Sequence, residues 1–375
     1  MQGPRPLELD EIDALGAMYG RTIERAPLGI FMPHNPNLFS EGNLENLCVL
    51  KDRERVCSHV GLNRFQITSM GCTFSAGCIG GVHTHEDYRK RGLATRILLH
   101  VYDRCRLDGV DFLAISGRRG LYSRNHAMQV GTAHRFTLGG EEAVSLADDR
   151  LDVRMPDEPP VDELARLQSM EPVRVIRPKQ VWEFFALTTS CHFAPSRTFV
   201  VCRRDRPVAY LLVRAENRDG TAAVLEFAGD RHDVCGALHG VLQQQEAERV
   251  SLQAMGWDSA LIWNLQAAGI ESRPESTDGT VCVINFAQTL NKLRPRLAER
   301  IGLAAAQDLS ARSDEDNVTF RLGADELTLP IDSATQLLFG TPPDEDEGDL
   351  GASKLAPILR EAFPILLPSY GMDYV

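Results

Sequence analysis

The stretch GGVHTHEDYRKRGLATRILLH, residues 80–100, constrains the fold of this chain more than any other. It joins a strand-like apolar run to a run whose apolar residues recur at helical spacing, with Asp108–Gly109 as a stop signal. The helical face consists of Leu93, Ile97, Leu98, Val101 and Cys105. The following VDFLAISG is typical of a buried strand. We therefore predict a strand, a basic glycine-containing loop, a helix and a strand within one α/β unit.

The loop between the predicted strand and helix has the composition of an anion site. A helix N-terminus carries unpaired N–H groups and the positive end of the helix dipole, so it favours phosphate. Gly92 stands at the helix entry and lets the backbone approach a ligand closely. Arg89, Lys90 and Arg91 add positive charge, and Thr95 can offer a hydroxyl. A diphosphate fits this description, although the spacing is neither that of a Walker loop nor G-x-G-x-x-G.

The rest of the chain predicts further units. A length of 375 residues with 43% hydrophobic residues allows two or three cores. Residues 46–84 read as a strand meander, and the charged, proline-rich residues 147–162 read as a linker. Three strands and a helix from about residue 233 then repeat the order of residues 46–106. This second copy has AGDRHDVCGAL where the first has its basic loop, and we interpret Asp230 to His232 as a turn.

The last third predicts a strand at TVCVINF and a helix, then the hairpin NVTFRLGADELTLPI and a short helix. The first helix would place Leu290, Leu293, Leu297 and Ile301 on one face. TPPDEDEGDL, residues 341–350, is typical of a solvated acidic loop. The chain ends in FPILLPSYGMDYV, which is apolar where termini are usually polar, so one interpretation is a tail that covers apolar surface.

Composition and charge exclude several classes of function. A net charge of −12 argues against nucleic-acid binding. No apolar run reaches the ~18 residues of a spanning helix, and the first residues lack the pattern of a signal peptide, so we expect a cytoplasmic protein without membrane contact. Nine cysteines without C-x-x-C pairs predict reduced, buried thiols and no metal site. We do not interpret Cys191–His192 as a nucleophile pair, because adjacent strand residues face opposite ways.

The basic loop resembles motif A of the GNAT superfamily of N-acetyltransferases, V-x-T followed by [QR]-x-x-G-x-[GA]. The matching residues are Val82, His83 and Thr84, then Arg89, Lys90, Arg91, Gly92, Leu93 and Ala94. The resemblance implies that the loop, with Thr95, binds the pyrophosphate of acetyl-CoA and that the backbone of residues 82–84 pairs with the pantetheine arm. It also implies that Tyr122, after the strand FLAIS, protonates the departing thiolate.

The whole chain is similar to the Eis (enhanced intracellular survival) type of acetyltransferase. That similarity implies an α/β (α+β) fold of tandem GNAT-type mixed sheets flanked by helices, plus a C-terminal sterol-carrier-like α+β domain. The expected domains are residues 1–155 with the acetyl-CoA site, 156–275 without a cofactor loop, and 276–375. Gly117, Arg118 and Tyr122 lie in a segment similar to S-E-G-G-I-Y of that group.

The same resemblance assigns a role to the apolar tail. It implies that the C-terminal carboxylate, here that of Val375, enters the site of the first domain as a base, held by neighbours such as Tyr370, Met372 and Tyr374. A carboxylate among apolar groups becomes more basic through desolvation. The group commonly forms hexamers, so a homo-oligomer is expected.

Two segments depart from the family pattern. His85 stands where many members have a proline, and SRNHAM after Tyr122 lacks the usual Arg-x-Gly-aromatic sequence. His83 and His85 alternate with Thr84 along the expected strand, so both would point to the face opposite Thr84. Structural hydrogen bonding and assistance to proton transfer both remain open for these histidines.

Three functions follow from these patterns. The first is acetyl transfer from acetyl-CoA to a primary amine of a small molecule or peptide, by direct attack and without metal. The second is a catalytically weak acyl-CoA-binding sensor or assembly module, which the altered segment after Tyr122 suggests. The third is lipid carriage by the last domain, which its resemblance to sterol carrier proteins suggests.

Overall fold

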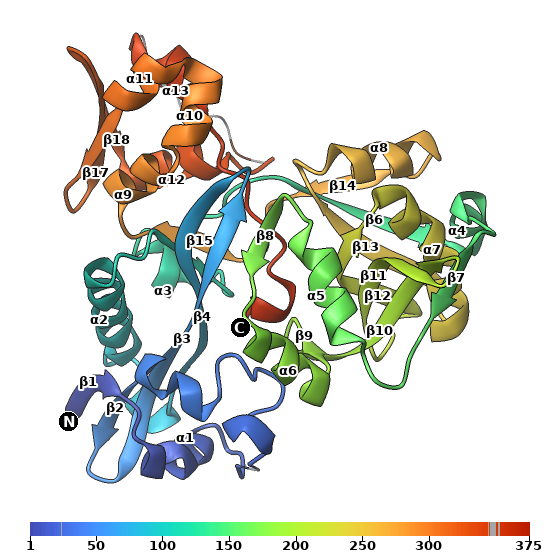
Figure 1. The fold of residues 1–375 in the computed structure, drawn as a ribbon. Helices are drawn as coiled ribbons and strands as arrows, with labels where there is room; N and C mark the ends of the chain where they lie inside the picture. The colour runs from blue at the N-terminus through green and yellow to red at the C-terminus, as the bar shows by residue number, and fades with distance from the viewer. Residues whose placement is uncertain (24, 344, 346–349, 352) are drawn as a thin grey trace.

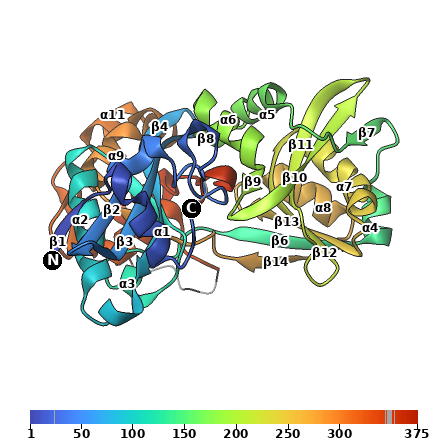
Figure 2. The same cartoon turned by 90° about the horizontal axis from the view of Figure 1, so that it is seen from below.

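The computed structural model describes residues 1–23, 25–343, 345, 350–351 and 353–375. They form two mixed sheets and a smaller three-stranded sheet, each flanked by helices. This confirms the predicted mixed α/β fold with flanking helices. The C-terminus lies between the two mixed sheets in both Figure 1 and Figure 2.

The first mixed sheet contains the predicted meander and the strand after the helix. Its order is β1-β2-β3-β4-β5-β15, and β8 pairs with β3. The strands are β1 (Gln2–Pro6), β2 (Leu47–Asp52), β3 (Arg55–Ser69), β4 (Cys72–Thr84), β5 (Phe112–Ile115), β8 (Val173–Ile176) and β15 (Thr280–Val283). The short helices are η1 (Leu9–Glu11), α1 (Ile12–Met18), η2 (Pro27–Gly29), η3 (Glu41–Asn46), η4 (Glu86–Tyr88) and α3 (Gly120–Ser123).

Helix α2 (Leu93–Leu107) confirms the predicted amphipathic helix. Its buried side includes all five predicted apolar positions: Leu93, Ile97, Leu98, Val101 and Cys105. These side chains share a core with Ile79 of β4 and Leu113 of β5. The predicted strand, basic loop, helix and strand are therefore all present.

The second mixed sheet has the order β14-β6-β13-β12-β11-β10-β7, with β9 paired to β10. The strands are β6 (Ala133–Gly139), β7 (Leu151–Arg154), β9 (Ser190–Cys191), β10 (Ala194–Arg203), β11 (Arg206–Arg214), β12 (Thr221–Gly229), β13 (Arg249–Met255) and β14 (Ser272–Glu275). The helices are α4 (Gly140–Leu146), α5 (Val161–Ser169), α6 (Lys179–Thr188), α7 (Arg231–Gln245) and α8 (Ser259–Ala267). β10, β11, β12 and α7 repeat the order of β2, β3, β4 and α2, as predicted.

Each mixed sheet contains strands from more than one of the expected domains. β6 pairs with β13 in the second sheet, although it precedes residue 155. β8 pairs with β3 and β15 pairs with β5, so segments from later in the chain complete the first sheet. Sheet membership therefore does not follow the boundaries expected at residues 155 and 275. Local sequence patterns record strands but not which distant strand they pair with.

Three local expectations differ from the structure. The expected linker at residues 147–162 contains β7, which pairs with β10. Asp230 to His232 is not a turn, because Asp230 caps α7 and the next two residues belong to that helix. The expected helix through Leu290 and Ile301 is two helices, α9 (Phe286–Lys292) and α10 (Arg294–Ile301), because Pro295 lacks an N–H and is favoured in a first helical turn.

The third part of the chain contains the predicted hairpin and short helix. Its strands are β16 (Ser310–Ser313), β17 (Asn317–Leu322) and β18 (Asp325–Pro330), and its further helices are α11 (Leu303–Asp308), α12 (Ile331–Phe339) and α13 (Leu355–Ala362). Half of the acidic loop expected at residues 341–350 lies outside the described residues. Apolar side chains of this part join those of the first sheet in one core. Within the described part of the chain, no helix has the length and apolar character needed to cross a membrane.

Candidate active site

The first sheet opens between β4 and β5. Their parallel pairing ends at Ile79↔Ile115, whereas β4 continues to Thr84. The β3–β4 register also shifts between His59↔His83 and Gly61↔Gly80, which places a bulge at this point. The backbone of Val82, His83 and Thr84 therefore extends past the end of β5.

Gly80 and Gly81 at the bulge allow two other segments to approach the strand. A Cβ atom at Gly80 would lie 2.3 Å from the carboxyl carbon of Val375. A Cβ atom at Gly81, which has φ of +59°, would lie 2.9 Å from Cζ of Phe39. Both positions thus require glycine. We did not single them out in the sequence, because nothing local shows that the chain end comes so close.

The loop after β4 leaves the N-terminus of α2 open. Gly92 is the N-cap in the left-handed region, with φ of 72°, and no side chain caps the helix. A Cβ atom added to Gly92 would meet nothing within 4 Å. Arg89, Lys90 and Arg91 are exposed beside this helix end. Open amides flanked by three cations are suited to a diphosphate, as the sequence predicted.

Contacts within the loop hold its shape. Arg89 Nε donates to the carbonyl oxygen of Thr84 at 3.2 Å, and Arg91 Nη2 donates to that of Asp87 at 2.8 Å. The guanidinium of Arg91 also lies over the ring of Tyr88, 5.1 Å from its centroid. The loop is thereby tied to the end of β4.

Tyr122 lies on α3 with only 4% of its surface exposed. Its ring packs so closely on the segment after β5 that a Cβ atom at Gly117 would lie 2.6 Å from Cε2 of Tyr122. Burial raises the pKa of Tyr122, and the buried thiol of Cys78 adds to this effect while Arg119 opposes it. The phenol therefore keeps its proton at neutral pH.

Val375 ends the chain beside the same strand. It is 1% exposed, and the Sγ atom of Cys78 lies 3.8 Å from its carbonyl oxygen. Burial raises the pKa of the Cys78 thiol to about 12, so this group is a neutral neighbour. Cys78 thus lies near both Tyr122 and the chain end.

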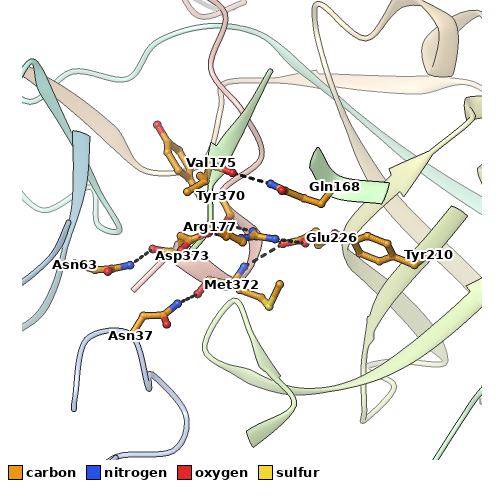
Figure 3. A network of polar contacts seen from close by, with 10 residues as sticks. All are labelled: Asn37, Asn63, Gln168, Val175, Arg177, Tyr210, Glu226, Tyr370, Met372 and Asp373. Carbon is orange, nitrogen blue, oxygen red and sulfur yellow. Dashed lines mark hydrogen bonds and ion pairs between the residues drawn. The ribbon is translucent and has the colours of Figure 1, made fainter. Parts of the chain in front are cut away.

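A buried ionic network holds the tail (Figure 3). Arg177 Nε pairs with the carboxylate of Asp373 at 2.6 Å, and its two Nη atoms pair with Glu226 at 2.6 and 2.7 Å. The Tyr210 hydroxyl and the backbone N–H of Met372 also donate to Glu226, at 2.6 and 3.1 Å. Residues from β11, β12 and the segment after β8 therefore converge on the last turn of the chain.

The first unit contacts the tail from the other side. Asn37 Nδ2 donates to the carbonyl oxygen of Met372 at 3.0 Å, and Asn63 Nδ2 donates to that of Asp373 at 3.1 Å. We expected Tyr370, Met372 and Tyr374 to hold the chain end. Tyr370 and Met372 contribute backbone groups to the network, which depends in addition on the side chains of Arg177 and Asp373. The sequence next to Asp373 gives no sign of this network, because the neighbouring residues FPILLPS are mostly apolar and the partners of Asp373 are distant in sequence.

Aromatic residues and histidines surround Gly81. The Tyr19 hydroxyl donates to the Gly81 carbonyl oxygen, which also lies 2.7 Å from His59 Nδ1. Burial lowers the pKa of His59 to about 4, so this ring is neutral. The His83 ring lies 5.0 Å from that of Tyr19, and burial with nearby positive charge lowers its pKa as well.

His85 and Arg118 are engaged elsewhere. His85 lies beyond the end of β4, where its side chain accepts a hydrogen bond from Asp87 N at 3.3 Å and contacts Arg55 at 2.9 Å. It therefore does not alternate along the strand as expected. The guanidinium of Arg118 donates to Ser276 Oγ at 3.1 Å.

A cavity of about 900 Å³ lies outside this site, on the second unit. Five arginines line it, Arg150, Arg166, Arg203, Arg204 and Arg206, together with Asp230 and Asp233. Three of these arginines have acidic partners: Arg203 pairs with Asp233 at 2.5 Å, Arg150 pairs with Asp148 at 2.8 Å, and Arg166 pairs with Glu163 at 2.8 Å. Among the described residues, no group of three or more histidines, cysteines and acidic residues could hold a metal ion.

Comparison with known proteins relates part of the chain to a described family. Residues 8–125 match a family described as an acetyltransferase (GNAT) domain. No curated protein matches the chain. The matched residues contain β2 to β5, the loop at Gly92, and Tyr122.

Solved structures share the fold over nearly the whole chain. A GCN5-related N-acetyltransferase from Anabaena variabilis has a TM-score of 0.67 at 11% identity, covering 99% of each chain. A protein of unknown function from Enterococcus faecalis, a probable N-acyltransferase, has a TM-score of 0.64 at 13% identity and 98% coverage of each chain. Eis1 from Mycobacterium abscessus has a TM-score of 0.63 at 12% identity and 96% coverage of each chain.

Residues 8–125 therefore form a GNAT acetyltransferase domain, and the chain is an enzyme of the acyltransferase class. The fold of the full chain is similar to that of Eis1.

Proposed function

We propose that this protein transfers the acetyl group of acetyl-CoA to a primary amine of a small molecule or peptide. One observation carries the proposal: the N-terminus of α2 at Gly92, which no side chain caps, follows the β4 strand after the loop of residues 85–92, and β4 extends beyond the end of its pairing with β5. Acetyl-CoA supplies a thioester carbonyl that an amine can attack.

The residues around the opening fit this substrate. The amides after Gly92, with Arg89, Lys90, Arg91 and the Thr95 hydroxyl, would bind the diphosphate. The backbone of Val82, His83 and Thr84 would pair with the extended pantetheine arm, since β5 ends before reaching them. Gly117 would allow the Tyr122 ring to pack next to the end of β5, close to the place proposed for the sulfur.

Tyr122 would act as general acid toward the leaving sulfur. Its raised pKa keeps the proton on the phenol until a thiolate forms beside it. The carboxylate of Val375 would take a proton from the amine, because it lies against Gly80 on the face that also carries Tyr19 and Phe39. His83 lies on this face too and is the competing base.

The third part of the chain would serve as a sterol-carrier-like support for the tail. The backbone N–H of Ile365 donates to the carbonyl oxygen of Leu338 at 2.7 Å, so the segment leading to Val375 starts from this part. We also propose a homo-oligomeric, cytoplasmic enzyme.

Thiol release from acetyl-CoA in the presence of an amine panel tests the function. We expect turnover with at least one amine and a loss of about 10²–10⁴-fold in kcat for Tyr122→Phe. Tyr102→Phe is the matched control, because Tyr102 is also buried in the core of α2. Calorimetric CoA binding without turnover on any amine would instead indicate a sensor.

Two variants separate the proposed bases. Deletion of Val375 shortens the chain by one residue and withdraws the carboxylate from Gly80, whereas His83→Gln removes only the imidazole. We expect the deletion to lower kcat by about 10²-fold or more and His83→Gln to have the smaller effect. The reverse order would assign the base to His83.

A further inference from the structure

The tip of the β9–β10 hairpin has an unusual sequence for its geometry. Cys191 pairs with Ala194, so the loop consists of His192 and Phe193 alone. Their φ angles are 53° and 62°, and two positive values define a type I′ turn. Such turns favour Asn-Gly, because most residues with a Cβ atom disfavour the left-handed region, whereas Gly and Asn tolerate it. The tip holds two aromatic rings in a conformation that costs free energy.

A second turn of the same unit provides a comparison. Arg204 and Asp205 connect β10 and β11 with φ angles of 51° and 62°. Their side chains are polar, which is ordinary at an exposed turn. The His192–Phe193 tip differs because its rings lie on other parts of the molecule.

The tip reaches the first unit and the tail. Ser190 Oγ donates to the carbonyl oxygen of His34 at 2.6 Å. The His192 ring stacks on that of Tyr374 with centroids 4.6 Å apart and planes at 12°. The Phe193 ring meets the same tyrosine edge to face at 5.5 Å. Tyr374 directly precedes Val375, so the tip lies next to the proposed base.

The surface presented by the tip is aromatic. Phe193 is 40% exposed, whereas Tyr374 beneath it is 6% exposed. The nearby charges already have partners: Asp278 lies 3.5 Å from His192 Nε2, Arg135 pairs with Glu275 at 2.7 Å, and Arg118 donates to Ser276. The group that remains available to a ligand is the exposed part of the Phe193 ring.

The tip belongs to the acceptor side of the site. The chain end approaches Gly80 on the face of β4 that carries Phe39 and Tyr19, whereas Tyr122 belongs to the core on the α2 side. A ligand that reaches Val375 past Tyr374 would meet Phe193. A diphosphate at Gly92 would not be held by this tip, which offers it no cation.

We propose that Phe193 is a specificity-determining residue for the amine acceptor and that it recognises an aromatic body attached to the amine. This inference rests on the proposed function and refines its substrate class. His192, held by Asp278 and Tyr374, acts as the positioning residue for the tip. The second unit would thus supply substrate recognition to the site of the first.

Phe193→Gly tests the proposal, because glycine accepts the turn geometry and the hairpin should remain folded. We expect kcat/KM for 2-phenylethylamine to fall by about three- to tenfold, the range of one aromatic contact. The value for 2-methoxyethylamine, which has no ring, should change by less than about twofold. KM for acetyl-CoA should stay constant. Arg204→Gly, at the matching turn, should change none of these values.

Several results would overturn the proposal. An equal fall in kcat/KM for both amines, or no fall for either, would show that Phe193 does not discriminate between amine acceptors. A raised KM for acetyl-CoA would place the tip on the coenzyme side. A change in solution mass without a change in amine selectivity would make Phe193 a contact between copies of the chain.

Direct binding keeps this test separate from the proposed function. Calorimetry with 2-phenylethylamine and CoA-saturated protein needs no turnover. Binding by the wild type that weakens in Phe193→Gly would support the inference even if the protein acetylates no amine. Turnover of other amines with no detectable binding of 2-phenylethylamine would overturn the inference and leave the proposed function intact.

Discussion

Helices α2 and α7 occupy the same place in two similar units but begin differently. At α2 the N-cap is Gly92, no side chain bonds to the first turn, and residues 85–92 form a basic connection. At α7 the connection is a single residue, Asp230, whose carboxylate accepts from the backbone N–H of His232 and Asp233 at 2.8 and 3.4 Å. The second helix thus carries its own anion where the first leaves room for one.

This difference shows how two similar units can have different roles. An internal carboxylate stabilises α7 but occupies the amides that would bind a phosphate. The second unit contributes instead through β11, β12 and the β9–β10 hairpin, which contact the tail. One unit would hold the coenzyme, and the other would hold the chain end.

The largest effect is expected where the two units meet. Arg177→Met would leave Glu226 and Asp373 buried without their cation, and we expect a loss of about 3–5 kcal/mol in the free energy of unfolding. Chemical denaturation would measure it. Arg203→Met is the control, because the pairs of Arg203 with Asp148 and Asp233 are partly exposed and should contribute far less to stability. Equal losses of unfolding free energy in the two variants would mean that the buried tail network contributes no more to stability than a partly exposed ion pair.

A second buried cluster belongs to the first unit alone. Arg5 Nη2 pairs with Glu11 at 2.6 Å and Lys51 Nζ pairs with it at 2.5 Å, and these bonds lower the pKa of Glu11 to about 2. Because the folded pKa lies below the unfolded value, this stability is present above about pH 4.5 and is lost as the pH falls through about 2. Glu11→Gln should cost about 2–3 kcal/mol at pH 7.

Melting of the wild type and Glu11→Gln from pH 7 to pH 2 would test this assignment. The difference in stability between the two proteins should shrink as the pH falls. A difference that is constant over the whole range would show that the ionisation of Glu11 has no part in it.

The smallest effect concerns the cap of α7. Asp230→Ala should cost about 1 kcal/mol, the usual value for a lost N-cap. CoA titration of this variant should still show one site per chain, because the second unit lacks the basic loop. A second binding event would mean that Asp230 alone closes a coenzyme site there.

Local patterns in the sequence predicted much of the fold, and for the candidate site they indicated the loop and helix start around Gly92. The spacing of Leu93 to Cys105 defines α2, and the composition of residues 89–92 indicates an anion, because both signals lie within a few turns of chain. Long-range pairings have no such signal. Nothing around Val281 shows that β15 completes the first sheet, and nothing around Asp373 points to Arg177. The His192–Phe193 tip was missed for a related reason, since aromatic residues rarely mark a tight turn.

Coenzyme binding at Gly92 tests the central claim most directly. Gly92→Asp and Gly92→Asn have side chains of similar size, and both residues tolerate the left-handed region, so the pair differs mainly in one negative charge. In CoA titrations we predict that the Asn variant binds within about tenfold of the wild type, while the Asp variant binds about a hundredfold more weakly or worse. Equal affinities of the two variants would contradict the placement of the diphosphate at the N-terminus of α2.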